Sequence, residues 1–259
     1  MQARSALFDL YGDHLRPRGG AAPVAAVVRL LEPVGIGAPA VRTAISRMVR
    51  DGWLEPVQTA GGRGYRTTER ANRRIDGTAE RIYRRDQRRW DGHWHLVLVN
   101  AAGERTVRAR LRADLRFLGY ADLGAGVWVS PFANRELGTV LERAGATART
   151  ARADHVEPLP TTAWDLDGLR SAYAGWLTTA ERLVDDRLAF AGLDPDQAAF
   201  TARFHLVHEW RKFLFADPGL PDELLPAEWP GRAAGALFTD LADWLRPGTD
   251  RFVARCLGD

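Results

Sequence analysis

The stretch VRTAISRMVRDGW, residues 41–53, constrains the fold of this chain more than any other, because it separates apolar from basic residues. Its apolar residues fall at i, i+4, i+7, i+8 and i+12, the spacing of one face of an α-helix: Val41, Ile45, Met48, Val49 and Trp53. No acid occurs before Asp51. The stretch therefore predicts an amphipathic helix whose outward face carries three arginines and two hydroxyls: Arg42, Thr43, Ser46, Arg47 and Arg50.

A basic helix face is often only a solvated surface, and such a helix can also pack inside a larger helical domain. The sequence upstream favours a third interpretation. Residues 5–15 and 23–35 both predict helices, the second from apolar residues at i, i+3, i+4 and i+7 after Pro23. A turn from Pro33 to Pro39 leads into the basic helix, and Gly52 stands where a helix can end in a left-handed conformation.

The sequence after the basic helix predicts a β-hairpin. Residues 53–60 and 65–69 are candidate strands, joined by the glycine-rich turn GGRG at 61–64. Arg63 is expected at the tip of the hairpin and Arg66 on the returning strand. Three helices followed by a hairpin make a winged helix-turn-helix, in which the third helix enters the DNA major groove and the wing reaches the adjacent backbone or minor groove.

The residue types on the basic helix suit that role. Arginine can bond bidentately to the O6 and N7 atoms of guanine, and small hydroxyls can contact bases or phosphates. A half-site of a few base pairs gives little specificity, so we expect a homodimer on a double-stranded, palindromic operator. The expected DNA-binding residues are Arg42, Thr43, Ser46, Arg47, Arg50, Arg63 and Arg66.

The charge distribution agrees with a nucleic-acid partner. Residues 1–90 hold 17 arginines and nine acids, a net charge of +8, whereas residues 91–259 hold 19 basic and 24 acidic residues, a net charge of −5. A basic N-terminal third followed by an acidic remainder is typical of a chain that meets phosphates at one end. Nearly all of the basic residues are arginine, which can reflect genome composition and indicates no function.

Composition excludes several other classes of protein. The chain is 46% hydrophobic, but no apolar run is long enough to cross a bilayer, and the N-terminal residues do not resemble a secretory signal. We therefore expect a cytoplasmic protein without membrane contact. The single cysteine, Cys256, excludes an intramolecular disulfide framework and a cysteine-cluster zinc site, and it is best interpreted as a packing residue.

A second region follows an arginine-rich connecting helix expected over residues 69–90. It alternates strands and helices, which predicts a ferredoxin-like domain: strand 94–99, helix 104–119, strand 126–132, helix 134–145 and strand 151–159. The first of these helices carries four arginines at steps of three and four residues. That stripe can be solvated, paired with acids or in contact with an anionic ligand: Arg105, Arg108, Arg112 and Arg116.

The last region is predicted to be helical. Helices are expected over residues 169–192, 198–217 and 232–245, with a proline-rich turn cluster at 217–231. The region is rich in tryptophan, which indicates buried aromatic surface: Trp164, Trp176, Trp210, Trp229 and Trp244.

Over essentially its full length the chain resembles the PaaX family of transcriptional regulators. The resemblance rests on GDHLRPRGG (12–20), VRTAISRMVRDGWL (41–54), WDGHWHLVLV (90–99) and above all HEWRKFLFADPGLPDELLPAEWPG (208–231). It implies an α+β multidomain protein with an N-terminal winged helix-turn-helix, a central ferredoxin-like (Cas2-like) domain and a helical C-terminal domain. The expected boundaries are 1–68, 69–90 for the connecting helix, 91–160 and 161–259.

The resemblance also implies a function and an effector. The family is associated with repression of aromatic-acid catabolic operons and with release from DNA by an aryl-CoA thioester such as phenylacetyl-CoA. Such an acyl- or aryl-CoA effector needs arginines for its phosphates and an aromatic pocket for its acyl group. Trp210, Arg211 and Lys212 are the candidate contacts, in a site expected between the central and C-terminal domains. The alternative is that WRKFLF is core packing with basic groups that reach the surface.

An enzyme that acts on nucleic acid, as a metal-dependent nuclease, or on an acyl-CoA is the runner-up interpretation. His205, His208 and Glu209 can share one helix face, but HxxHE matches neither HExxH nor HxxEH, and a hydrogen-bonded structural pair is favoured over a metal site. Cas2-like folds include metal-dependent nucleases with an aspartate at the end of the first strand, where this chain has Asn100. We therefore expect no catalysis, cofactor or metal. A constitutive DNA-binding protein without an effector remains open.

Overall fold

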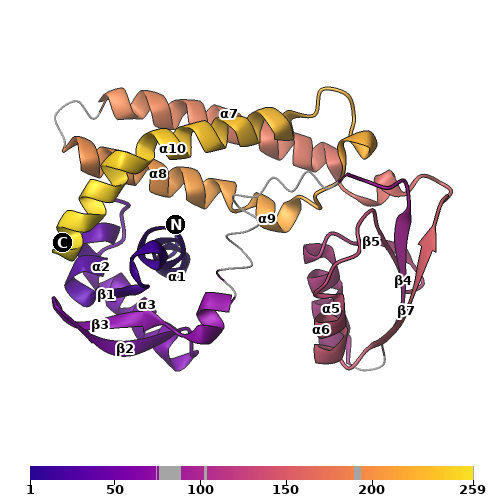
Figure 1. The fold of residues 1–259 in the computed structure, drawn as a ribbon, viewed down its shortest axis with the longest axis horizontal. Coiled ribbons are helices and arrows are strands. Elements are labelled where there is room, and N and C mark those ends of the chain that lie inside the picture. Colours follow the sequence, from indigo (N-terminus) through magenta and orange to yellow (C-terminus); the bar gives the residue numbers. More distant parts are fainter. Residues whose placement is uncertain (74, 76–88, 102–103, 190–193, 259) are drawn as a thin grey trace. The chain divides into compact units, whose positions relative to one another are not determined.

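The computed structural model describes residues 1–73, 75, 89–101, 104–189 and 194–258 (Figure 1). Contacts within the chain group it into two compact units. The terminal unit comprises Met1–Arg85, Gly175–Arg211 and Arg232–Asp259, so it contains both ends of the chain. The central unit comprises Asp86–Ala174 and Lys212–Gly231. No helix among the described residues is long and apolar enough to cross a membrane.

The N-terminal part of the terminal unit combines helices with a small antiparallel sheet. After α1 (Ala3–Asp9), a π-helical stretch (Leu10–Leu15) and a 3₁₀ turn (Arg16–Arg18) continue the helix expected over residues 5–15. The sheet has the order β1-β3-β2. The remaining elements are β1 (Ala21–Pro23), α2 (Val24–Leu31), α3 (Ala38–Arg50), β2 (Leu54–Thr59) and β3 (Gly62–Thr67).

Helix α3 is the basic helix expected from the sequence, and its apolar stripe faces inward. Val41, Ile45 and Met48 are buried in one core with residues of α1 and α2, and Val49 and Trp53 pack against that core. The helix begins earlier than expected, because Pro39 lies in its first turn, where a missing N–H and a fixed φ are tolerated. It ends at Arg50, just before Gly52, which has a φ of 72° as expected.

The hairpin is present, but the positions predicted for its turn and for Arg63 were wrong. The turn is Ala60–Gly61, so Arg63 lies within β3 opposite Gln58 and not at the tip. Strand β1 was not expected, because three residues, AAP, give no periodicity. Gly64 of β3 is the one sequence feature that reflects the presence of β1. A Cβ at this position would come within 2.3 Å of the carbonyl oxygen of Ala22, so only glycine lets β1 and β3 approach.

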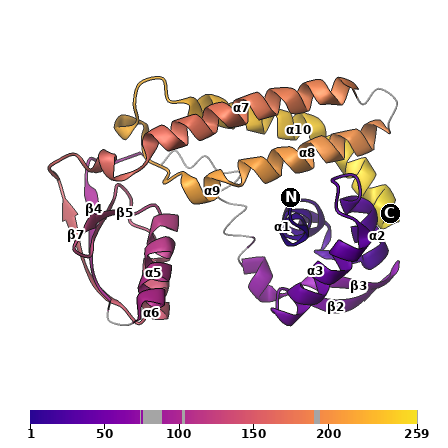
Figure 2. The same cartoon turned by 180° about the vertical axis from the view of Figure 1, so that it is seen from behind.

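Three long helices form the C-terminal part of the chain: α7 (Leu166–Ala189), α8 (Pro195–Trp210) and α10 (Pro230–Leu257). Helix α8 begins with a side-chain cap, since the Asp194 carboxylate accepts a hydrogen bond of 3.1 Å from the backbone N–H of Asp196. Within the terminal unit α8 packs against α1, and Figure 2 shows the two elements from behind.

Two of these helices differ from the sequence prediction. The helix expected over residues 198–217 is interrupted after Trp210 and followed by the short α9 (Phe213–Ala216), although no glycine or proline marks the break. The helix expected to end at residue 245 continues through Pro247 to Leu257. Proline removes one backbone hydrogen bond there, but Phe252, Val253 and Cys256 bury their side chains in the shared core and stabilise the extension.

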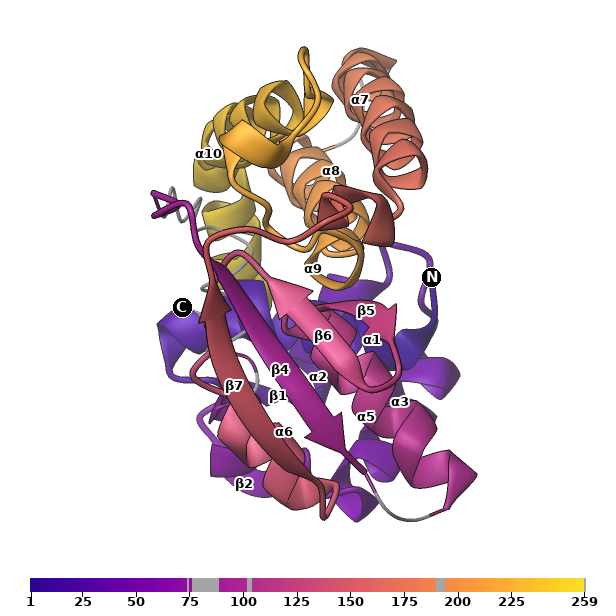
Figure 3. The same ribbon diagram turned by 90° about the vertical axis from the view of Figure 1, so that its right-hand side faces the viewer.

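The central unit is a four-stranded antiparallel sheet with two helices on one face (Figure 3). The strand order β5-β6-β4-β7 and the succession βαββαβ are those of a ferredoxin-like fold, as expected. Strand β5 was not expected, and β7 begins four residues before the expected strand. The elements are β4 (Trp94–Asn100), α5 (Arg105–Phe117), β5 (Ala121–Gly124), β6 (Val127–Ser130), α6 (Leu137–Arg143) and β7 (Thr147–Ala153).

The connecting helix expected over residues 69–90 lies mostly outside the described residues. Its first five residues, 69–73, are helical, and Ala71 is buried.

Candidate nucleic-acid interface

The outward face of α3 is fully displayed to solvent. All five residues expected there are exposed, and among the described residues none of its arginines takes part in an ion pair: Arg42, Thr43, Ser46, Arg47 and Arg50. The Ser46 hydroxyl donates to the Arg42 carbonyl at 3.0 Å, which leaves its oxygen free to accept. The nearest acid along the chain, Asp51, pairs with Arg4 at 3.2 Å. The face therefore offers three guanidiniums that no acid among the described residues pairs with.

The position of this face is fixed by the packing on both sides of α3. The ring of Trp53, just past the helix, lies edge-on to Phe8 of α1 with centroids 5.3 Å apart, and the guanidinium of Arg70 lies 4.7 Å from the Trp53 ring. Met48, in the last turn of the helix, is buried in the core. A rigidly held basic helix is the arrangement that a major-groove contact requires.

The two arginines of the hairpin, Arg63 and Arg66, differ in their surroundings. Arg63 is exposed on β3. Arg66 lies two residues after the buried Gly64, and its Nε donates to the Glu55 carboxylate of β2 at 2.7 Å. Both side chains of this pair are about half-exposed, so the pair is open to competition from solvent or phosphate. A hollow of about 520 Å³ beside Arg66 is lined by Arg16, Glu55, Arg66 and Glu69, whose charges balance.

The three residues proposed from sequence for an effector are neighbours in the chain, but they face different partners. The Trp210 ring stacks on Phe238 with centroids 4.7 Å apart and meets Trp176 edge-on at 4.8 Å. The Arg211 guanidinium forms an ion pair with Asp9 at the end of α1, and partial burial lowers the pKa of Arg211. Lys212 is exposed and belongs to the central unit.

Sequence reasoning missed the charged groups buried between the first helix and α8. The Asp9 carboxylate, 2% exposed, pairs with Arg211 and also lies 2.7 Å from Nδ1 of His208. One turn later, Asp13 forms an ion pair with Arg203, whose side chain is 3% exposed. The signal was two acids four residues apart among apolar residues of the first helix, but no pattern shows which of 36 basic residues is the partner.

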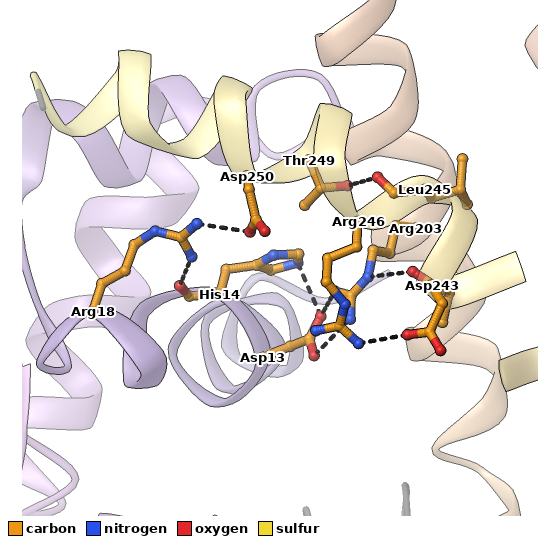
Figure 4. A network of polar contacts seen from close by, with 10 residues as sticks. Asp13, His14, Arg18, Arg203, Asp243, Leu245, Arg246, Thr249 and Asp250 are labelled. Atoms are coloured by element: carbon orange, nitrogen blue, oxygen red, sulfur yellow. Dashed lines mark hydrogen bonds and ion pairs between the residues drawn. The ribbon is translucent and has the colours of Figure 1, made fainter. Parts of the chain in front are cut away.

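Figure 4 shows the second of these contacts with its neighbours. The Arg203 Nε donates to the carbonyl of Ala242 on α10 at 3.2 Å, so one guanidinium links three helical segments. His14 lies beside Asp13, with Nε2 3.4 Å from its carboxylate. Burial lowers the pKa of His14 to about 4, outweighing the opposite effect of Asp13, so the ring is neutral at pH 7. Arg18 bonds to the His14 carbonyl at 2.8 Å and to Asp250 at 2.7 Å.

The residues weighed for a metal share helix α8 but form no metal site among the described residues: His205, His208 and Glu209. His208 is held by Asp9, and burial lowers the pKa of His205. In the part of the chain that the structure describes, no group of three His, Cys, Asp or Glu side chains is placed to hold a metal ion. Asn100 is the last residue of β4 in the central unit, the position discussed above for a nuclease aspartate.

Comparison with known proteins assigns the chain to a family. Three family models match it: PaaX-like protein over residues 2–71, PaaX protein central Cas2-like domain over 87–163, and PaaX-like protein C-terminal domain over 164–255. The chain belongs to the PaaX family. The resemblance inferred from the sequence is thereby confirmed, and with it the Cas2-like character of the central unit.

Two individual proteins are similar to this PaaX-family chain over nearly its full length. The Transcriptional repressor PaaX of Escherichia coli (strain K12) is 30% identical to it over 96% of this chain and 82% of the relative. A solved structure, an uncharacterized protein from Mycobacterium tuberculosis, is similar with a TM-score of 0.58 and 29% identity, over 97% of this chain and 98% of that one.

Proposed function

We propose that this PaaX-family chain is a DNA-binding transcriptional repressor and not an enzyme, and that residues 1–68 act as a winged helix-turn-helix. The observation that carries the proposal is the outward face of α3, where Arg42, Arg47 and Arg50 are exposed, free of ion pairs among the described residues and mounted on a buried core. The name of the Escherichia coli relative, a transcriptional repressor, supports the same conclusion.

In this proposal α3 lies in the major groove. Arg42 and Arg47, five residues apart on the exposed face, contact base edges, while Thr43 and Ser46 between them reach bases or phosphates. The hairpin lies along the adjacent backbone, where Arg63 binds a phosphate directly and Arg66 does so by exchanging Glu55 for a phosphate. A homodimer places two such modules on half-sites about one helical turn apart, on a palindromic operator.

The test is a selection of bound fragments from genomic DNA, followed by titration of the selected operator and a random duplex. Arg47→Ala should weaken operator binding by roughly 1–3 kcal/mol and random-duplex binding by less, if the side chain contacts a base. Arg246→Ala, which removes an exposed arginine of α10 in the same unit, is the matched control and should leave both affinities unchanged. Absence of any duplex affinity at low salt would refute the proposal.

We further propose that the repressor controls an aromatic-acid or other acid catabolic operon and is released by an aryl- or acyl-CoA thioester, as the family resemblance implies. Trp210, Arg211 and Lys212 are the proposed contacts. The ion pair between Arg211 and Asp9 supplies a route for the signal, because a CoA phosphate that binds Arg211 competes with Asp9 of α1, and α1 packs directly on α3. A tenfold loss of operator affinity requires about 1.4 kcal/mol of coupling.

The effector proposal is tested by titrating the protein–operator complex with phenylacetyl-CoA, acetyl-CoA, CoA and phenylacetate. Release by a thioester at concentrations where phenylacetate has no effect supports the proposal. Release by phenylacetate alone contradicts the role given to the arginine, and no release by any of the four contradicts the switch. Lys212→Gln, at an exposed position, should weaken the response to the thioester without changing operator affinity in its absence.

A further inference from the structure

Helix α5 of the central unit carries a stripe of four arginines that the proposed function does not use. Its members, the α5 stripe, are Arg105, Arg108, Arg112 and Arg116. At 3.6 residues per turn they fall within a sector of about 80° around the helix axis, and they extend along it for about 16 Å. All four are exposed. The stripe is therefore one continuous surface on one helix.

The protein compensates little of this charge. Arg112 approaches Asp122 at 3.9 Å, the outer limit of an ion pair, and its side chain is 63% exposed. Among the described residues the other three arginines have no ion pair. The acid within the helix, Asp114, lies about half a turn away from the stripe. Ala109 and Ala113, which flank the stripe on its exposed side, are small and do not shield it.

The helix holds the stripe in a fixed position. Leu111 and Leu115 are buried against the sheet, and the helix ends at Phe117, two residues before Gly119, whose φ is 91°. A Cβ at Gly119 would lie 2.8 Å from the carbonyl oxygen of Pro218, so this end of the helix packs closely on its neighbour in the same unit. Like charges at i and i+4, as at 108–112 and 112–116, destabilise a helix unless an anion lies across them. The packing of α5 keeps these charges together despite their repulsion.

We infer that the α5 stripe is a second DNA contact, which binds the phosphate backbone of the duplex without reading its sequence. This inference rests on the proposed DNA-binding function. Duplex DNA presents one negative charge per about 1.7 Å of its axis, so a stripe of about 16 Å faces phosphates along its whole length. Guanidinium groups bind phosphate oxygens in bidentate geometry. The stripe itself contains no hydroxyl or amide, in contrast to α3, so it is equipped for phosphates and not for the different edges of the bases.

The test is the salt dependence of duplex binding by the full-length protein. In the stripe variant all four arginines are replaced by glutamine: Arg105→Gln, Arg108→Gln, Arg112→Gln and Arg116→Gln. The slope of log K against log salt concentration is negative, and each phosphate contact adds about 0.9 to its magnitude. The magnitude should therefore be smaller by about 2 to 4 in the stripe variant. Affinity at low salt should fall at least tenfold, equally for the operator and for a random duplex of the same length. Circular dichroism and thermal unfolding should match the wild type, because the side chains are exposed.

A control variant with the same change in net charge shows whether the effect depends on where the arginines lie or only on how many are removed. It replaces four other exposed arginines of the central unit: Arg135→Gln, Arg143→Gln, Arg149→Gln and Arg152→Gln. This variant should keep a slope within about 1 of the wild-type value. An equal loss in both variants would reduce the effect to net charge and overturn the inference.

The remaining outcomes separate this inference from the proposed function. If the wild type binds DNA and Arg47→Ala weakens that binding, but the stripe variant keeps the wild-type slope and affinity, the inference fails alone. If the wild type binds no duplex, the proposed function fails and the inference falls with it. If the stripe variant loses binding to phosphatidylglycerol vesicles but keeps its affinity for DNA, the partner of the stripe is a membrane surface and the inference is wrong.

Discussion

The outward face of α3 and the contact between the first helix and α8 use the same side chain in opposite ways. On α3 the arginines are exposed and, among the described residues, unpaired. At the contact with α8, Arg203 and Arg211 are removed from solvent to a large extent and each is paired with an aspartate. The two regions belong to the same unit and are linked by α1, which packs on both α3 and α8.

The difference shows that the environment, and not the residue type, decides what an arginine does here. A guanidinium in water gains little from a single partner and remains available to a phosphate or a base. A buried guanidinium that loses its partner leaves an uncompensated charge in the core, so its pairing is a requirement for stability. We therefore expect substitutions on α3 to change DNA affinity, and substitutions at the buried contact to change the free energy of unfolding.

The largest effect is expected at the buried contact. Arg203→Met removes the buried guanidinium that pairs with Asp13, whose side chain is only 10% exposed, and should lower the free energy of unfolding by about 3–5 kcal/mol, measured by urea unfolding followed through tryptophan fluorescence. The double variant Arg203→Met with Asp13→Leu, which removes both charges, should recover much of that loss. A single variant with nearly wild-type stability would show that the pair is not an essential part of the core.

The next effect is a pH dependence that only the buried region can produce. Burial lowers the pKa of His14 to about 4, against 6.5 for the exposed side chain. Between those values the unfolded chain binds a proton that the folded chain does not bind, so stability falls as the pH drops from about 6.5 to about 4 and His14 contributes no further change below that. The full contribution is about 3 kcal/mol.

The wild type should therefore lose stability over this pH range relative to His14→Leu, whose unfolding lacks this proton uptake. The comparison removes the contribution of other titrating groups, among them His205, whose pKa is also lowered by burial. A difference between the two proteins that stays constant from pH 7 to pH 4 would contradict the neutral state assigned to His14.

A smaller effect, on a different quantity, is expected on α3. Arg42→Ala should weaken operator binding by about 1–3 kcal/mol while the free energy of unfolding stays within about 0.5 kcal/mol of the wild type. Binding is measured by fluorescence anisotropy and stability by urea unfolding of the same preparation. A loss of stability comparable with that of Arg203→Met would remove the contrast between the two regions.

The smallest effect is expected at the hairpin. Its ion pair between Arg66 and Glu55 is exposed, like the arginines of α3, but paired, like the arginines of the buried contact. Glu55→Gln releases Arg66 from its partner and should change stability by no more than about 1 kcal/mol. It should also strengthen duplex binding slightly, because Arg66 becomes free for a phosphate and one repelling carboxylate is removed. Weaker binding by this variant would indicate that Glu55 holds Arg66 in the geometry that contacts the DNA.

Local patterns allowed the main elements to be predicted from the sequence. The spacing of Val41, Ile45 and Met48 was sufficient for α3 and its exposed face, and Gly52 for its end. Short elements without periodicity were missed, as with β1 and β5, and so was the extension of α10 past Pro247, which depends on tertiary packing of Phe252 and Val253.

The buried ion pairs could not be predicted for a related reason. Asp13 and Arg203 are 190 residues apart, and nothing local to either residue indicates the other. The same limit applies to Arg211, for which the sequence left open an effector phosphate or a place in core packing. In the structure its guanidinium pairs with Asp9, so any effector phosphate has to compete with a buried carboxylate.

The DNA-binding role of α3 is tested most simply by asking whether duplex DNA covers its outward face. Ser46→Cys introduces an exposed thiol in the middle of that face, while the native Cys256 is buried. Ala236→Cys places a matched thiol on an exposed position of α10 in the same unit. Alkylation by a maleimide is followed by mass spectrometry with and without operator duplex. We expect DNA to slow modification at position 46 at least tenfold and to leave position 236 unaffected. Equal rates at position 46 with and without bound DNA would show that α3 does not contact the duplex.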